Sequence, residues 1–133
     1  HEYRGEVIRI IDGDSLVVRI DLGFRIKHEA AIRLAGIDAP EVVGPTHNAG
    51  QAAREFVRRW FKDRIGENTF DGWPIMLRTS KNPLDKFGRY LAVVFPMISA
   101  PAGSGFGLIP SSESLNDALV LAGHAKPYDG GKR

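Results

Sequence analysis

The stretch from Ile10 to Glu41, IIDGDSLVVRIDLGFRIKHEAAIRLAGIDAPE, decides the fold. It contains two apolar runs of strand character, Ser15 to Ile20 and Ala31 to Ile37, with a glycine between them that allows a chain reversal. If the runs pair as an antiparallel hairpin, the chain leaves and re-enters at the same end. We therefore expect Asp14 and Asp38, which stand at that end, to be neighbours.

Two carboxylates brought close together repel each other and raise each other's pKa unless a cation lies between them. The hairpin thus predicts a metal site at its open end. Residues two apart on a strand share a face, so Arg33 is out of phase with Asp38, and a bend near Gly36 is needed to bring both to one site. Taken alone, the Asp-Gly-Asp segment around Asp14 is as typical of a simple turn as of a metal site.

Four segments of the chain resemble the staphylococcal nuclease-like (thermonuclease) family. They are IDGDS at 11–15, RLAGIDAPE at 33–41, DKFGRYLAVVF at 85–95 and LNDALVLAG at 115–123. The segments occur in the family's order and cover most of the chain. The resemblance implies a nuclease built on an OB-fold.

The pattern of elements predicts the same fold independently. Strands are expected at 6–11, 15–20, 31–37, 73–79 and 89–95, and apolar residues three and four apart predict a long helix over 48–64. A short C-terminal helix should begin after Ser114, which can cap it. The 133 residues are therefore expected to form one α+β, mainly β domain, an OB-fold whose five-stranded Greek-key barrel carries the long helix between strands 3 and 4.

Residues 96–114 are rich in Gly, Pro, Ser and Ala and show little periodicity. We expect them to form an inserted loop between the last strand and the C-terminal helix. Loops of this length in compact domains usually carry a function, so this one could bind a protein partner or take part in an assembly.

By resemblance, the chain would be a divalent-metal-dependent endonuclease that hydrolyses DNA and RNA with little sequence specificity and prefers single strands. Asp14 and Asp38 would hold one Ca²⁺ together with the Ala39 carbonyl, and such oxygen ligands would also admit Mg²⁺ or Mn²⁺. Arg33 and Arg89 would clamp the phosphate from two sides, because a guanidinium offers forked donors and keeps its charge.

The resemblance assigns four further residues. Glu41 falls where the family has the residue that activates or only orients the attacking water. Lys86 could contact a terminal phosphate, and Phe87 offers a stacking face where the family has a tyrosine. Tyr128 could stack on a base or pack against the barrel.

A second function stays open at this point. A nuclease-like module without activity could bind single-stranded nucleic acid or a protein partner. The set Asp14, Arg33, Asp38, Glu41 and Arg89 is complete, which favours the enzyme, because a binding module needs no such set. Arginines on the outer face of the predicted helix and at the hairpin tip are more typical of solvated surface than of a nucleic-acid contact.

Composition excludes several classes of protein. Cysteine is absent, which rules out disulfides, thiolate nucleophiles and sulfur-ligated zinc. The net charge of +2 gives little global attraction for nucleic acid, so local clusters must provide it. No apolar run approaches the ~18 residues of a membrane span. The compartment stays undetermined, and the start at His1 is consistent with a removed leader segment.

Overall fold

The computed structural model describes residues 1–67, 72–84, 88–100 and 107–128. Its elements, in chain order, are β1 (Glu2–Asp12), β2 (Ser15–Asp21), β3 (Lys27–Leu34), β4 (Ile37–Asp38), α1 (His47–Arg64), β5 (Trp73–Leu84), β6 (Tyr90–Ser99), β7 (Leu108–Pro110), α2 (Leu115–Leu121) and β8 (Lys126–Pro127). No helix in these residues is both long and apolar enough to cross a membrane.

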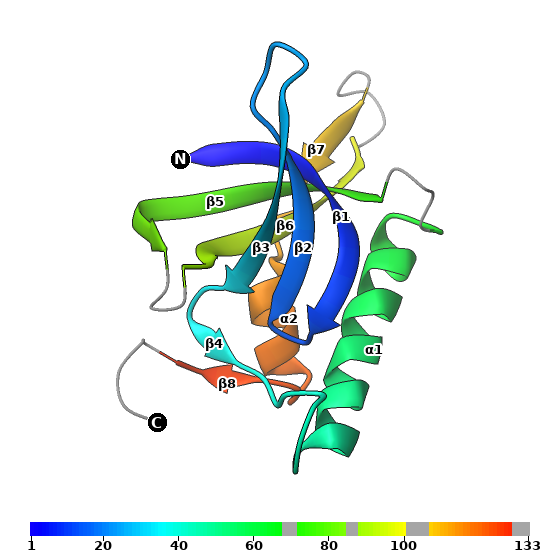
Figure 1. The fold of residues 1–133 in the computed structure, drawn as a ribbon. Coiled ribbons are helices and arrows are strands. Elements are labelled where there is room, and N and C mark those ends of the chain that lie inside the picture. Colours follow the sequence, from blue (N-terminus) through cyan, green and yellow to red (C-terminus); the bar gives the residue numbers. More distant parts are fainter. Residues whose placement is uncertain (68–71, 85–87, 101–106, 129–133) are drawn as a thin grey trace.

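Five strands form a closed barrel. They are hydrogen-bonded in the order β3-β2-β1-β5-β6, and β3 also pairs with β6 in parallel, which closes the sheet on itself. Strand β1 bends around the barrel with two register shifts, between Val7 and Arg9 and between Ile10 and Asp12, as expected where bulges increase curvature. The predicted OB-fold with its long helix before the fourth barrel strand is confirmed (Figure 1).

The barrel interior is apolar, and both helices pack against it. Alternate residues of the strands point inward, and α1 and α2 bury one stripe each against the barrel wall. The largest fully buried side chains are Val7, Leu16, Val18, Ile32, Leu34, Val57, Phe61, Ile75, Leu77, Val94, Leu115 and Leu119. Each of these contributes about 1.5–3 kcal/mol by leaving water, so the core fixes the strand register on which the site depends.

The buried side chain of Asn116, in α2, ties this helix to the barrel. Its Nδ2 donates to the carbonyls of Ala35 (2.8 Å) and Ala92 (3.2 Å), and its Oδ1 accepts from the Val94 amide (3.0 Å). Helix α2 begins as predicted after Ser114, whose hydroxyl accepts a hydrogen bond from the Asp117 amide. These bonds fix α2 against the point where β3 and β6 meet.

The predicted loop at 96–114 is partly wrong. Strand β6 continues to Ser99, and β7 pairs with it antiparallel, with Met97 opposite Pro110 and Ser99 opposite Leu108. Backbone pairing occurs here although Gly and Pro interrupt the alternation of apolar residues, because the β6 backbone already offers hydrogen-bonding groups to a neighbour. Residues 101–106 lie outside the described part of the chain.

Candidate active site

The turn between β1 and β2 carries Asp14 and packs tightly. A Cβ on Gly13 would lie 2.7 Å from the Cβ of Ala53 and 3.1 Å from that of Ala39. Glycine is therefore required for the turn to fit between α1 and the chain after β4. The fit leaves Asp14 only 7% exposed.

The second carboxylate reaches the same place through a bend. Strand β3 ends at Leu34, Gly36 follows with φ +77°, and the chain continues into β4, which carries Asp38. The register pairs Arg33 with Ser15 of β2 and Leu91 of β6, on the opposite face from the core residues of β3. The bend that the sequence analysis required near Gly36 is thus present.

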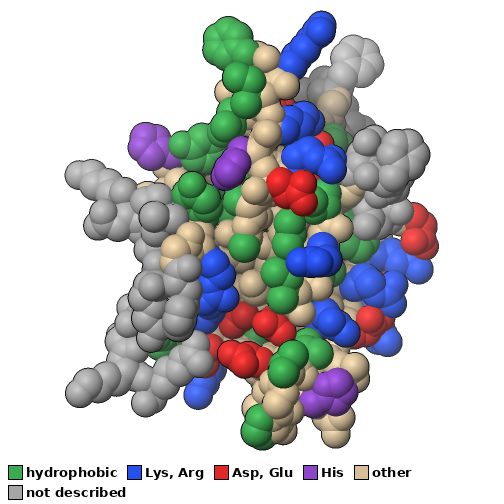
Figure 2. Space-filling view, viewed as in Figure 1, with side chains coloured by type: hydrophobic (Ala, Val, Ile, Leu, Met, Phe, Trp, Pro, Cys, Tyr) green, Lys and Arg blue, Asp and Glu red, His purple; other side chains and the backbone are tan. Residues whose placement is uncertain are grey.

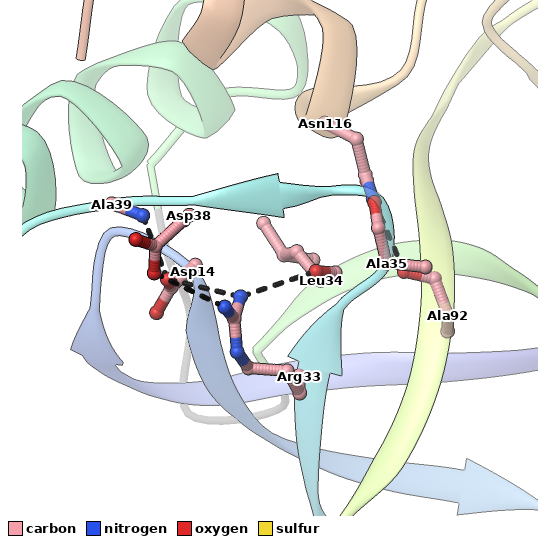
Figure 3. A network of polar contacts seen from close by, with 8 residues as sticks. All are labelled: Asp14, Arg33, Leu34, Ala35, Asp38, Ala39, Ala92 and Asn116. Atoms are coloured by element: carbon pink, nitrogen blue, oxygen red, sulfur yellow. Dashed lines mark hydrogen bonds and ion pairs between the residues drawn. The ribbon is translucent and has the colours of Figure 1, made fainter. Parts of the chain in front are cut away.

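Arg33 contacts both carboxylates (Figure 3). Its Nη1 is 2.9 Å from Asp14 Oδ2, and its Nη2 donates to Asp38 Oδ1 at 3.4 Å. Nη1 also donates to the Leu34 carbonyl, and the Ala39 amide donates to Asp14 Oδ2 at 2.8 Å. The expected closeness of Asp14 and Asp38 is confirmed, and the arginine is part of the same buried network.

Burial is the main cause that raises the pKa of Asp14 above its ordinary value. The hydrogen bond from the Ala39 amide and the charge of Arg33 lower that pKa, whereas the charges of Asp38 and Asp12 raise it further. The net effect is that the pKa of Asp14 is raised, so burial disfavours its ionised form in the metal-free protein.

Asp12 is a third acid of the site, which the sequence analysis did not assign. Its Oδ1 accepts a hydrogen bond from the Val42 amide at 3.0 Å, which ties the chain after Glu41 to the end of β1. Its charge acts on Asp14. The sequence feature that could have identified Asp12 is its position two residues before Asp14 in the same Asp-Gly-Asp segment. Figure 2 shows acidic side chains gathered at this end of the barrel with basic ones beside them.

The donor set fits a hard divalent cation with few protein ligands. Asp14 and Asp38 offer carboxylate oxygens that meet at Arg33, and Ala39, the residue after Asp38, would add its carbonyl. A cation would favour the ionised form of Asp14, whose pKa burial raises. In the described residues, no three His, Cys, Asp or Glu side chains form a cluster that could hold a metal by themselves. A cation here would therefore keep water ligands.

Glu41 follows the site on an exposed stretch between β4 and α1. Its carbonyl accepts from Thr46 Oγ1 at 2.7 Å, and a Cβ on Gly50 of α1 would overlap the same carbonyl. The backbone at Glu41 is thus in contact with both Thr46 and Gly50. Glu41 lines a groove of about 560 Å³ together with Asp38, Ala39 and Lys126.

Arg89 directly precedes β6. Tyr90 pairs with Ile32 and Leu91 with Arg33, so Arg89 lies two residues, or about 7 Å along the chain, before the neighbour of Arg33. Alternation places it on the same face of the sheet as Leu91. The apolar row that follows it packs outside the barrel, in a small cluster of Met76, Val93, Phe95 and Met97.

Of the three residues predicted to bind the substrate, the structure describes only Tyr128. Lys86 and Phe87 lie outside the described residues. Tyr128 follows β8, which pairs with β4, and its amide donates to the Gly36 carbonyl at 2.8 Å. The C-terminal segment therefore runs beside the bend that brings Asp38 into the site (Figure 1).

Comparisons with known proteins agree with this geometry. A family profile described as staphylococcal nuclease homologue matches residues 31–132. Micrococcal nuclease of Shigella flexneri is 32% identical over 127 residues, which cover 96% of this chain and 59% of that protein. Thermonuclease of Staphylococcus intermedius is 31% identical over 100 residues, or 71% and 51% of the two chains. Protein ParB of Escherichia coli is 29% identical over 127 residues, or 96% and 58%. The chain thus spans between half and three fifths of the length of these relatives.

Proposed function

Since the chain belongs to the family of staphylococcal nuclease homologues, we propose that it is a Ca²⁺-dependent endonuclease that hydrolyses phosphodiester bonds in DNA and RNA. Mg²⁺ or Mn²⁺ are alternative cofactors, because the donors are all oxygen. We propose further that the enzyme prefers single-stranded nucleic acid and cleaves it with little sequence specificity.

One observation carries the proposal: the carboxylates of Asp14 and Asp38 meet at one buried arginine, Arg33, at the rim of an OB-fold barrel. An ordinary structural ion pair needs one carboxylate for each guanidinium. Here two carboxylates converge on one arginine, and the pKa of Asp14 is raised in spite of that arginine. The excess of negative charge supports a site for a divalent cation.

The two arginines have separate tasks in this proposal. A cation held by Asp14, Asp38 and the Ala39 carbonyl would supply positive charge to the phosphoryl oxygens and would promote ionisation of a water molecule. Arg33 uses Nη1 and Nη2 for the carboxylates and the Leu34 carbonyl, while its Nε–H has no partner among the described residues and can donate to a phosphoryl oxygen. Arg89 approaches from β6 and binds a second phosphoryl oxygen, so charge that develops during cleavage is met from two sides.

Glu41 is proposed to accept the proton of the attacking water or to orient that water. Its exposed position in a groove with Asp38 gives water access, and the contacts at its carbonyl hold the backbone in place. Proton transfer to a positioned carboxylate typically contributes ~10²- to 10⁴-fold in rate. Lys86, Phe87 and Tyr128 are proposed to bind the substrate beyond the reacting phosphate.

Cleavage of a labelled single-stranded DNA and of a single-stranded RNA tests the proposal. We expect cleavage with Ca²⁺, no cleavage with a chelator, and loss of most activity in Asp14→Ala and Arg89→Ala. Arg59→Ala removes one positive charge from an exposed position on α1 and should cleave like the wild type. If both strands stay intact with Ca²⁺ but bind to the protein, the chain is instead a binding module without activity.

A further inference from the structure

A second positively charged groove lies between β1 and α1, outside the site described above. It has a volume of about 330 Å³ and is lined by Arg9 from the strand, by Arg54, Glu55 and Arg58 from the helix, and by apolar side chains that include Trp73. Strand and helix run side by side here (Figure 1), and Figure 2 shows basic side chains over this region.

The charge of this groove is not balanced. Glu55 is its one acidic side chain, and Arg58 holds that carboxylate through Nε (3.0 Å) and Nη2, with Arg59 Nε at 3.6 Å from the same group. Arg9 and Arg54 form no ion pair with any residue that the structure describes. The groove therefore has two guanidinium groups, from two different elements, that are available to an anion.

The groove lies close to the acidic end of the barrel along β1 and α1. Arg9 precedes Asp12 by three residues on β1, which is a distance of about 10 Å along the strand. Arg54 follows Ala53, the residue that packs against Gly13 in the turn before Asp14. A strand of nucleic acid whose scissile phosphate lies near Asp14 could therefore place another phosphate in the groove.

We propose that Arg9 and Arg54 bind a backbone phosphate of the substrate strand, away from the bond that is cleaved. This proposal rests on the proposed function, since it takes nucleic acid as the ligand. A guanidinium keeps its charge and offers forked donors, so each of these arginines can form a charge-assisted hydrogen bond to a phosphate oxygen. The groove gives affinity for long strands and takes no part in the reaction itself.

Binding of a labelled single-stranded DNA of about 16 nucleotides, the upper end of the range for one OB-fold, tests this proposal. Anisotropy titrations in chelator over a series of salt concentrations give the slope of log K against log salt. Arg54→Gln and Arg9→Gln should each lower the steepness of that slope by about 0.7, the value for one phosphate contact in a single strand. Arg59→Gln is the matched control, because it removes the same charge from the neighbouring face of α1 and should change the slope less.

Two readouts separate this proposal from the proposed function. Hydrolysis of a dinucleotide, which is too short to reach the groove, should be the same in Arg54→Gln and in the wild type. If Arg54→Gln and Arg9→Gln bind the long strand like Arg59→Gln, the groove proposal is overturned even when cleavage is normal. If the wild type cleaves nothing but the two groove variants lose affinity, the proposed function fails and the groove proposal stands. Denaturation midpoints equal to that of the wild type exclude a folding defect.

Discussion

Gly50, in the first turn of α1, lies directly against the backbone of Glu41. A Cβ at Gly50 would overlap the Glu41 carbonyl and come within contact of the Val42 nitrogen. The same carbonyl accepts a hydrogen bond from the Thr46 hydroxyl. The position of Glu41 relative to Asp38 is therefore set by a helix glycine that is nine residues away in the sequence.

We predict that Gly50→Ala moves the segment that carries Glu41 and lowers kcat by about 100-fold, the effect of a displacement of about 1 Å at a catalytic group. Elsewhere in a helix the same change would stabilise the protein by about 1 kcal/mol. Here the overlap with backbone atoms should cancel that gain. Steady-state cleavage of single-stranded DNA measures the effect, and Gln51→Ala, at the exposed next position, is the control. Wild-type kcat in Gly50→Ala would contradict the prediction.

We predict that Arg33→Ala destabilises the metal-free protein by about 3–5 kcal/mol, because it leaves Asp14 and Asp38 facing each other without a counter-ion. Arg33→Lys should cost less, since an ammonium keeps the charge but loses the forked geometry. Added Ca²⁺ should restore part of the loss in Arg33→Ala. Urea denaturation with and without Ca²⁺ measures all three effects. An Arg33→Ala variant as stable as the wild type in chelator would show that the contacts of Arg33 with Asp14 and Asp38 contribute nothing to the free energy of unfolding.

The raised pKa of Asp14 has a defined consequence for stability. The folded protein binds the Asp14 proton more tightly than the unfolded chain does, so this carboxyl favours folding below its ordinary pKa of 3.8. That contribution is lost as the pH rises through the raised pKa. In chelator, the free energy of unfolding of Asp14→Asn relative to the wild type should therefore increase over this range and then level off.

Denaturation at a series of pH values measures that difference. Ca²⁺ should reverse it, because a cation favours the ionised carboxylate of the wild type and has less affinity for an amide. A difference between Asp14→Asn and the wild type that does not change with pH would contradict the prediction.

The sequence was sufficient to predict the barrel and the meeting of Asp14 and Asp38, because both follow from local rules. Alternation of apolar residues identifies the two strands of the hairpin, and a hairpin must bring its ends together. The bend at Gly36 could be predicted because Arg33 and Asp38 otherwise lie on opposite faces. The contact of the buried Arg33 with both carboxylates was not predictable, since it depends on side chains from the β1–β2 turn, β3 and β4 meeting in space.

The inward face of β6 and the presence of β7 could not be predicted from the local sequence. In β6, both alternate rows are apolar, with Ala92 and Val94 facing the barrel and Val93 and Phe95 packing outside it, so alternation could not show which row faces inward. Strand β7 is only three residues long and exposed, and its pairing with β6 depends on a neighbour rather than on its own sequence. The roles of Arg33, Arg89 and Glu41 remain predictions that the activity measurements above will test.

The last prediction concerns Asn116, whose side chain joins α2 to β3 and β6 through three hydrogen bonds. Asn116→Ala leaves the Val94 amide and two carbonyls without these partners at a position that is 4% exposed, and an unsatisfied buried group costs about 1–3 kcal/mol. We expect a loss of at least about 2 kcal/mol in the free energy of unfolding, measured in urea, and Asp117→Asn, at the exposed next position, should lose much less. Because Ala35 precedes the bend at Gly36, Asn116→Ala should also weaken Ca²⁺ binding, measured by calorimetry, even in the fraction that stays folded. An unchanged Ca²⁺ affinity would show that the bend holds Asp38 in place without help from α2.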